Sequence, residues 1–249
     1  MKLLELVLSK GKRFMERKQG FYEKYIKRLI DIVCASAALI VFWWLYLIVA
    51  ILVRINLGSP VIFKQPRPGK DEKIFNMYKF RSMTDVRDEN GNLLPDEMRL
   101  TKFGKALRST SMDELPEAFN ILNGTMTLIG PRPQLVRDMT FMTPEQRMRH
   151  CVRPGLSGLA QTRGRNALSW NDKLATDLEY IQNITFLGDV KIVFDTVKQV
   201  FFKQKGQENK DIDEVDITDD YGDYLLKKGL VTQEEYDQKQ KEAREILGV

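Results

Sequence analysis

Residues 32–53 read IVCASAALIVFWWLYLIVAILV, a run of 22 positions without a charged side chain. At 1.5 Å per residue, a helix over this run would be ~33 Å long, which is enough to cross the hydrocarbon core of a bilayer. Lys27 and Arg28 precede the run and Arg54 follows it, so positive charge flanks both ends and gives no clear inside end. The run therefore predicts membrane insertion and leaves two modes open: a simple span, or a helix that enters and leaves through the same face.

Charge is spread unevenly along the 249 residues, which carry 39 basic and 34 acidic side chains. Residues 1–28 hold nine basic and three acidic side chains, whereas residues 206–249 hold six basic and thirteen acidic ones. A basic front beside an apolar run favours anionic lipid or phosphate partners over nucleic acid. The two cysteines and the single histidine argue against a disulfide framework and against metal chemistry based on Cys or His.

An acidic pair, Asp113 and Glu114, is the strongest candidate for chemistry. Ser111 with Glu114 three residues later fits a capping box, which predicts that a helix begins there, and Gly124 predicts its end. One interpretation is that these side chains only cap the helix. The other is that the helix start presents an ionised Asp113 to a phosphate-bearing substrate.

Arginine segments rich in proline or glycine follow the acidic pair. Arg132 lies between two prolines, Arg153 precedes Pro154-Gly155, and residues 163–166 read RGRN. Prolines stiffen the backbone, so such an arginine can offer its planar fork to a phosphate at low ordering cost. Together these segments indicate phosphate handling. None matches a glycine-lysine-serine phosphate loop or a dinucleotide fingerprint.

Hydrophobic periodicity and turn residues predict the remaining helices and strands. Residues 61–64 and 74–80 predict two strands joined by proline and glycine turns, residues 100–108 a short helix, and residues 170–182 a helix with Leu174, Leu178 and Ile181 on its apolar face. Residues 192–201 predict a further amphipathic helix, for core packing or for the membrane surface. An acidic linker over 206–216 contains Asp211-Ile212-Asp213, which we interpret as a solvated charge run and not as a metal-binding triplet. Two short helices follow, the second with a capping box at Thr232 and Glu235.

Six short stretches, spread over roughly residues 25–203, resemble those of the bacterial sugar transferases, specifically the small monotopic phosphoglycosyl transferases. They are Lys27-Arg28-Leu29-Ile30-Asp31, Phe63-Lys64-Gln65, Lys79-Phe80-Arg81-Ser82-Met83, Ser111-Met112-Asp113-Glu114-Leu115-Pro116, Leu128-Ile129-Gly130-Pro131-Arg132-Pro133 and Arg153-Pro154-Gly155-Leu156-Ser157-Gly158.

The resemblance implies a membrane enzyme that transfers a sugar phosphate from a UDP-sugar to undecaprenyl phosphate and releases UMP. It gives Asp113 the role of a nucleophile that becomes phosphosugar-bearing, next to a bound Mg²⁺, and Glu114 an assisting role. A carboxylate attacks a charged diphosphate only where a metal and cations neutralise the charge, which agrees with these roles. The positions expected to bind phosphate or substrate are Arg108, Lys79, Arg81, Arg132, Arg153, Asp177 and Asp189.

One departure concerns the membrane helix. The family usually breaks this helix with a Ser-Pro pair, whereas this chain has Trp43-Trp44 there and no proline between Lys27 and Gly58. We still expect re-entry, because a span would carry the basic residues 1–28 across the membrane against the positive-inside tendency. Packing of Trp43 and Trp44 is expected to hold the bend.

The expected fold is therefore a mostly helical α/β protein. It comprises a basic amphipathic segment (1–28), a re-entrant membrane helix (29–56), a catalytic domain with a small β-hairpin and interfacial helices around a compact cytosolic core (57–205), and an acidic linker with a helical tail (206–249). It would lie on the bacterial plasma membrane, facing the cytoplasm. The expected partners are the UDP-sugar, undecaprenyl phosphate and membrane lipid, no nucleic acid, and further copies of the chain or downstream glycosyltransferases. Two other functions remain open at this stage: a non-catalytic binder of nucleotide-sugar or lipid phosphate, and a glycosyltransferase that releases UDP.

Overall fold

The computed structural model describes residues 19–164, 168–201 and 220–249. Most of the basic segment, the end of the RGRN stretch, and the acidic linker with Asp211-Ile212-Asp213 lie outside the described residues. The chain forms two compact units. The first contains the described residues up to Leu29 together with Pro66–Phe75 and the chain from Thr125 onward, and the second contains Ile30–Gln65 and Asn76–Gly124. Short strands among many helices confirm the predicted mostly helical α/β class.

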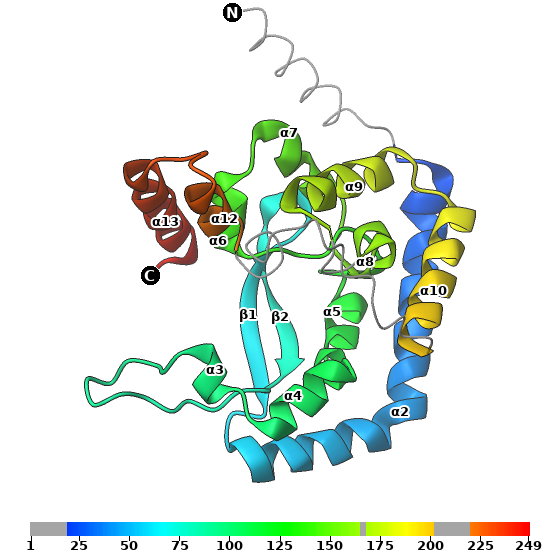
Figure 1. The fold of residues 1–249 in the computed structure, drawn as a ribbon. Coiled ribbons are helices and arrows are strands. Elements are labelled where there is room, and N and C mark those ends of the chain that lie inside the picture. Colours follow the sequence, from blue (N-terminus) through cyan, green and yellow to red (C-terminus); the bar gives the residue numbers. More distant parts are fainter. Residues whose placement is uncertain (1–18, 165–167, 202–219) are drawn as a thin grey trace, which may run out of the picture. The chain divides into compact units, whose positions relative to one another are not determined.

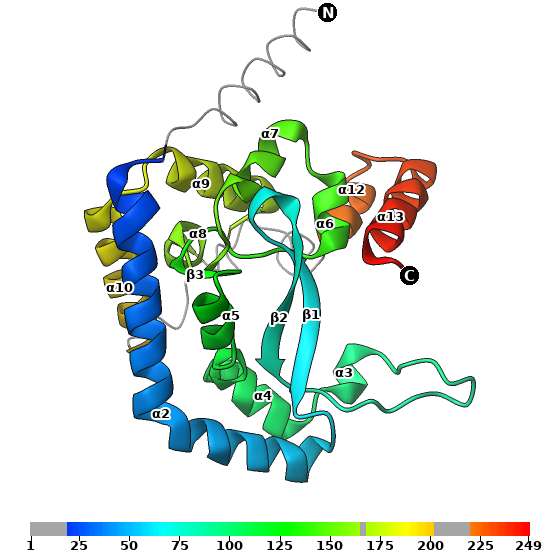
Figure 2. The same ribbon diagram turned by 180° about the vertical axis from the view of Figure 1, so that it is seen from behind.

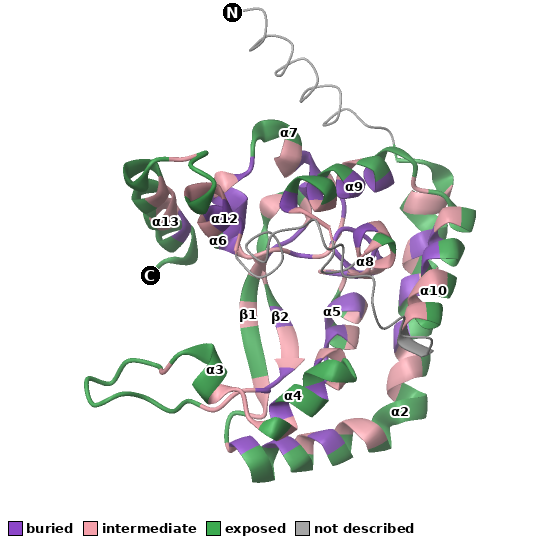
Figure 3. Ribbon diagram, viewed as in Figure 1, coloured by how far each residue is buried: buried purple, intermediate pink, exposed green. Residues whose placement is uncertain are grey.

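The apolar run forms one long helix, α2 (Lys27–Leu57), which continues a π-helical turn at Tyr22–Ile26. Together these 36 residues are the only helix in the described part of the chain that is long and apolar enough to cross a membrane. Figure 1 shows that α2 turns sharply partway along its length. Most of its large apolar side chains are exposed, among them Ile40, Val41, Leu47 and Ile55, and Figure 3 shows this exposed surface in green.

The bend in α2 is not held by Trp43 and Trp44, because both side chains are exposed, by 63% and 49%. The expectation that they pack against neighbouring helices is therefore wrong within this chain. Tyr46 makes the contact instead: its hydroxyl donates to the Leu115 carbonyl at 2.7 Å, and its ring lies 6.3 Å from that of Phe80. Beyond it, Val49, Val53 and Leu57 are buried in one cluster with Phe80 and Leu107. With no proline in α2, we attribute the bend to this packing of its C-terminal half.

The predicted hairpin is confirmed as strands β1 (Ile62–Pro68) and β2 (Ile74–Phe80), which pair as a two-stranded sheet. Gly69 lies in the turn between them, where an added Cβ would lie only 3.0 Å from the Lys73 carbonyl oxygen. Lys79, near the end of β2, forms ion pairs with Glu114 and Glu117 in the second unit.

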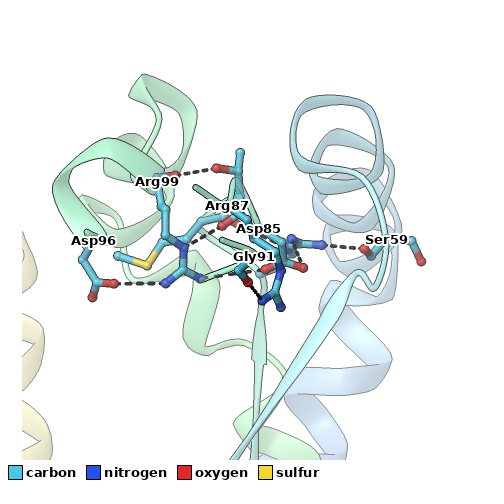
Figure 4. A network of polar contacts seen from close by, with 9 residues as sticks. Ser59, Asp85, Arg87, Gly91, Asp96 and Arg99 are labelled. Carbon is cyan, nitrogen blue, oxygen red and sulfur yellow. Dashed lines mark hydrogen bonds and ion pairs between the residues drawn. The ribbon is translucent and has the colours of Figure 1, made fainter. Parts of the chain in front are cut away.

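The second unit also contains α3 (Asp96–Arg99), α4 (Lys102–Ser109) and α5 (Glu117–Asn123). Ion pairs order α3 and the segment before it. Figure 4 shows Arg99 and Asp96, which pair at 3.1 Å; before α3, Arg81 pairs with Asp85 at 2.5 Å. Helix α4 is capped by Thr101, whose side chain accepts from the Gly104 N–H. An added Cβ at Gly104 would lie 1.9 Å from the Ser82 carbonyl oxygen, so only glycine allows α4 to approach this closely.

The first unit is built around a parallel pair of short strands, β3 (Thr127–Ile129) and β4 (Gly155–Ser157). The helices between and after them are α6 (Val136–Phe141), α7 (Pro144–Arg147), α8 (Leu159–Arg163), α9 (Trp170–Gln182) and α10 (Phe186–Phe201). Helix α9 has the predicted bounds, and its predicted apolar residues Leu174 and Ile181 are buried. Helix α10 begins six residues before the predicted stretch. It buries Ile192 but exposes Phe186, Leu187, Val190, Val193, Phe194 and Val197.

The two C-terminal helices, α12 (Tyr221–Lys227) and α13 (Gln233–Leu247), pack on α6, and both views show them side by side (Figures 1 and 2). The predicted capping box of Thr232 and Glu235 is confirmed. Ala243 is buried with Val136 and Met139. The tail is thus an integral layer of the first unit.

Candidate active site

The acidic pair lies on a single 3₁₀ turn, Met112–Glu114, between α4 and α5. Ser111 begins the turn with φ +56°, a left-handed conformation that is uncommon outside glycine. The predicted capping box is wrong: Ser111 makes no side-chain cap hydrogen bond, and the α-helix begins only at Glu117. Pro116 lies just before the helix, where its missing N–H costs nothing. The Glu114 carboxylate binds a lysine instead of the helix cap.

Lys79 is that lysine, and it connects β2 to the acidic turn. Its Nζ lies 2.9 Å from Glu114 Oε1 and 3.3 Å from Glu117 Oε1. The side chains of all three are at most 20% exposed, and that of Glu117 only 2%. The structure therefore adds a third, deeply buried carboxylate to the predicted pair. The sequence shows Glu117 only as one more charge at a helix start.

Asp113 itself is buried, with 8% of its surface exposed. Burial raises the pKa of its carboxyl group above the usual value, with a smaller upward contribution from the Glu114 charge; Lys79 and Arg108 act in the opposite direction. A partly desolvated carboxylate beside cations is the environment expected of a nucleophilic aspartate. A scaffold role in capping would not require this burial.

The two arginines predicted to bind phosphate near the acidic pair, Arg108 and Arg81, differ in exposure and in their contacts. Arg108, near the end of α4, is exposed, and its Nε donates to Ser82 Oγ at 2.8 Å. This contact aims the guanidinium without burying it, which suits a phosphate-binding group. Arg81 is buried and donates to the Ser59 and Met83 carbonyls in addition to pairing with Asp85. Its contacts in this structure order the chain around β2.

The donor set around Asp113 is compatible with Mg²⁺. Among the described residues, no three His, Cys, Asp or Glu side chains are arranged to form a metal cage. Mg²⁺, however, is usually held by one or two carboxylates together with substrate phosphates. Asp113 and Glu114, adjacent hard oxygen donors, fit this mode, with a diphosphate substrate supplying the remaining ligands.

The first unit brings two of the three predicted arginine segments together. Arg132 follows β3 and Arg153 precedes β4, and the backbone between them is joined by a hydrogen bond from Gly155 N to the Pro131 carbonyl at 3.0 Å. Both arginines are half-buried. Arg149, which was not predicted from the sequence, donates to the Arg132 carbonyl at 2.6 Å and so fixes the backbone of this segment.

Asp177 and Asp189, also in the first unit, both form buried ion pairs. Asp177 accepts from Arg149 Nε and Nη2 at 2.9 and 2.6 Å, and burial raises the pKa of the Asp177 carboxyl group against the opposing effect of Arg149. Asp189 pairs with Lys27, at the start of α2, and accepts from Tyr180 and Tyr22 at 2.8 and 2.7 Å. The structure shows both carboxylates held by these side chains, and their role in substrate binding stays a prediction.

The structure therefore groups Lys79, Arg81, Arg108, Asp113 and Glu114 in one unit. Arg132, Arg153, Asp177 and Asp189 belong to the other unit. A buried carboxylate, a lysine bridging two further carboxylates and an exposed arginine form a site suited to phosphoryl chemistry.

Comparison with known proteins identifies the class. The family model for bacterial sugar transferases matches residues 22–203, and the chain belongs to this family. It is 46% identical over 187 residues to the uncharacterized sugar transferase EpsL of Bacillus subtilis (strain 168), covering 75% of this chain and 93% of that protein. It is 40% identical over 184 residues to the UDP-N-acetylgalactosamine-undecaprenyl-phosphate N-acetylgalactosaminephosphotransferase of Aeromonas hydrophila, covering 71% and 44%. It is 39% identical over 188 residues to the UDP-glucose:undecaprenyl-phosphate glucose-1-phosphate transferase of Klebsiella pneumoniae, covering 72% and 40%. The chain thus matches less than half of the latter two proteins.

Proposed function

We propose that this protein transfers a sugar 1-phosphate from a UDP-sugar to undecaprenyl phosphate and releases UMP. The observation that carries the proposal is the buried Asp113 next to Glu114 and the Lys79 ion pairs, in a member of the bacterial sugar transferase family. Relatives named for this transfer, at 40% and 39% identity, support the substrate classes. The step would begin the membrane-bound stage of glycan assembly.

In the first half-reaction, a carboxylate oxygen of Asp113 attacks the phosphorus that bears the sugar. The bond from this phosphorus to the bridging oxygen of the diphosphate breaks, and UMP leaves with the bond's electron pair. The product on the enzyme is an acyl phosphate that carries the sugar. Desolvation of Asp113 favours this attack because the carboxylate has less water to shed.

In the second half-reaction, a phosphate oxygen of undecaprenyl phosphate attacks the same phosphorus, and the acyl oxygen leaves as the free Asp113 carboxylate. The products are the undecaprenyl diphosphate sugar and the regenerated enzyme. Glu114 would accept the proton of an acceptor phosphate that arrives protonated. Lys79, 2.9 Å from Glu114, orients this carboxylate and offsets its charge.

The charge on the diphosphate must be neutralised for a carboxylate to attack it. Mg²⁺ held by Asp113 and Glu114 would supply part of this neutralisation as a Lewis acid. Arg108 would bind a phosphate oxygen from the side of α4, with its Nε oriented by Ser82. For the first unit, we propose separately that the joined segments of Arg132 and Arg153 bind phosphate.

We further propose that α2 is re-entrant and that the site works at the cytoplasmic surface of the bacterial plasma membrane. Lys27, at the start of α2, pairs with Asp189, which lies beyond α2 in the sequence. A helix that crossed the bilayer would place these two residues on opposite sides, because the described residues contain no second helix long and apolar enough to bring the chain back. The exposed apolar residues of α10, Phe186 to Val197, would lie on a membrane surface.

The direct test is a screen of UDP-sugars with undecaprenyl phosphate and Mg²⁺, using the full chain in lipid nanodiscs and measuring UMP. Release of UMP is expected with at least one sugar. Release of UDP would indicate transfer of the sugar without its phosphate. Absence of turnover with every sugar would favour the non-catalytic binder.

The nucleophile is tested by replacing Asp113→Asn, with Asp96→Asn as an exposed aspartate control in the same unit. We expect loss of UMP release only in Asp113→Asn, with unchanged insertion and folding. Glu114→Gln, with Glu97→Gln as its control, should turn over poorly. Given UDP-sugar alone, it should still accumulate a phosphosugar adduct on Asp113 that intact mass spectrometry detects. Near-normal UMP release by Asp113→Asn would exclude this residue as the nucleophile.

A further inference from the structure

Asn120, on α5, is an asparagine whose side chain binds the backbone of a strand. Only 1% of the residue is exposed. Its Oδ1 accepts from the Tyr78 N–H at 2.9 Å, and its Nδ2 donates to the Asn76 carbonyl at 2.8 Å. Both backbone groups belong to β2, and Lys79 is the next residue along that strand.

These two hydrogen bonds complete an edge that would otherwise be open. Among the described strands, β2 pairs only with β1, so its other edge needs partners for its backbone N–H and C=O groups. A carboxamide carries one donor group and one acceptor and can replace a short piece of strand. Asn120 therefore fixes the position of β2 along α5 as a neighbouring strand would.

The same face of α5 carries Glu117, one turn earlier, with Lys79 Nζ 3.3 Å from its Oε1. Helix and strand are thus joined at two levels: by Asn120 to the backbone before Lys79, and by Glu117 to the side chain of Lys79. We propose that Asn120 is a positioning residue for the transfer reaction, and that it holds β2 so that the Lys79 ammonium lies between Glu114 and Glu117. This inference rests on the proposed function.

Displacement of Lys79 should change the electrostatic environment of Asp113. The charges that surround Asp113 come from every neighbouring element: Lys79 on β2, Arg108 on α4, Glu114 on the turn and Glu117 through its pairing with Lys79. If Lys79 moves away, Glu114 loses its ion pair and the site loses the ammonium beside the reacting carboxylate, so that kcat falls.

The test compares Asn120→Ala with Asn123→Ala, an exposed asparagine on the same helix. UMP release is measured from pH 5 to 9 with the full chain in nanodiscs. We expect kcat to fall about 10²-fold in Asn120→Ala, as for other small misplacements of a reacting group. KM should change little, and Asn123→Ala should match the wild type. In a Lys79→Met background, Asn120→Ala should cause little further loss, because both act through one group.

Asn120→Asp provides a second, near-isosteric variant. When protonated, its carboxyl group offers a donor and an acceptor to the same two backbone groups; when ionised, it offers only acceptors and repels the Asn76 carbonyl. Its kcat relative to the wild type should therefore be highest at the lowest pH. This rescue distinguishes positioning from a loss of packing.

The outcomes separate this inference from the proposed function. Absence of UMP from the wild type would overturn both. UMP from the wild type, together with an unchanged kcat in Asn120→Ala, would overturn the role of Asn120 alone. If the losses of kcat caused by Asn120→Ala and Lys79→Met were additive in the double variant, the role of Asn120 would also be overturned. The same holds if both Asn120 variants fail to fold, since Asn120 would then act on the fold as a whole.

Discussion

Replacing Lys79 with methionine should separate the two roles that this lysine has in the structure. Methionine keeps the length and apolar stem of the side chain but removes the ammonium that pairs with Glu114 and Glu117. The Glu117 side chain, 2% exposed, then keeps its charge in a buried position without the lysine. The Glu114 side chain, 20% exposed, is more accessible to water and should tolerate the loss better.

Removing one partner of a buried ion pair typically costs about 3–5 kcal/mol of folding free energy. For a chain of this size, each kcal/mol corresponds to about 2–4 °C in melting temperature. Lys79→Met should therefore melt roughly 6–20 °C below the wild type. Adding Glu117→Gln removes the buried charge and should restore most of this stability. It should not restore UMP release, because Asp113 and Glu114 still lack the ammonium.

Thermal unfolding in nanodiscs, followed by tryptophan fluorescence, measures the first effect, and UMP release at a temperature well below melting measures the second. Exposed Lys191→Met is a matched control, since its ion pair with Asp195 lies on the surface of α10. A melting temperature of Lys79→Met within about 2 °C of the wild type would show that the Glu117 charge is stabilised in another way. Recovery of activity in the double variant would refute a catalytic role for Lys79.

Three further predictions concern other parts of the chain. Arg108→Ala should raise KM for the UDP-sugar, and Arg108→Lys should recover little because the planar fork is lost; equal KM values for lysine and arginine would contradict this. Tyr221→Ala should weaken the attachment of α12 and α13 by about 3 kcal/mol and expose α13 to protease while UMP release persists; loss of UMP release would show that the tail supports the site. Burial raises the pKa of Asp138 to about 6 from 3.8. Its contribution to stability is therefore fully present below about pH 4 and is lost as the pH rises to about 6, a change of about 3 kcal/mol. Protection of the α13 amides from hydrogen exchange should therefore fall between about pH 4 and pH 6. Protection that does not depend on pH in this range would show that Asp138 makes no such contribution.

Patterns that depend on local periodicity were predicted well. The α9 bounds, the β1–β2 hairpin and the capping box of α13 each follow from side chains that act within one element. The acidic pair and the three Arg/Pro/Gly segments also stand out in the sequence, because unusual clusters of charge and proline are visible without tertiary structure. The roles assigned to them remain predictions.

The start and buried face of α5 were not predictable in the same way. Leu115, Phe119 and Leu122 have the spacing of one helical face, which predicts that they point inward. Phe119 is nevertheless 48% exposed, and the buried side chains are Glu117, Asn120 and Ile121. Two polar residues are inside because β2 offers them a lysine and an open strand edge. Such partners come from some 40 residues earlier in the sequence, so a helical pattern alone cannot show them.

The bend of α2 leads to a final prediction about membrane topology. Tyr22 donates to Asp189 and Lys27 pairs with it, while Tyr46, near the other end, donates to the Leu115 carbonyl beside the acidic turn. A span would place Tyr22 and Lys27 on the opposite side of the membrane from Asp189, because the described residues contain no second helix long and apolar enough to bring the chain back. Breaking the buried pair of Lys27 and Asp189 alone would cost about 3–5 kcal/mol. Re-entry keeps both sets of contacts, at the cost only of a bend that Tyr46 helps to hold.

Single cysteines at Lys24 and Glu89, placed in a background with Cys34 and Cys151 replaced, test this directly. Position 24 lies just before α2, and position 89 lies in an exposed loop of the second unit. A membrane-impermeant thiol reagent is applied to right-side-out and to inverted membrane vesicles. Re-entry predicts that both cysteines react only in inverted vesicles, because both ends of α2 then face the cytoplasm. A cysteine at 24 that reacts in right-side-out vesicles, while that at 89 reacts only in inverted ones, would establish a span and require the contacts of Asp189 with Tyr22 and Lys27 to be absent in the membrane.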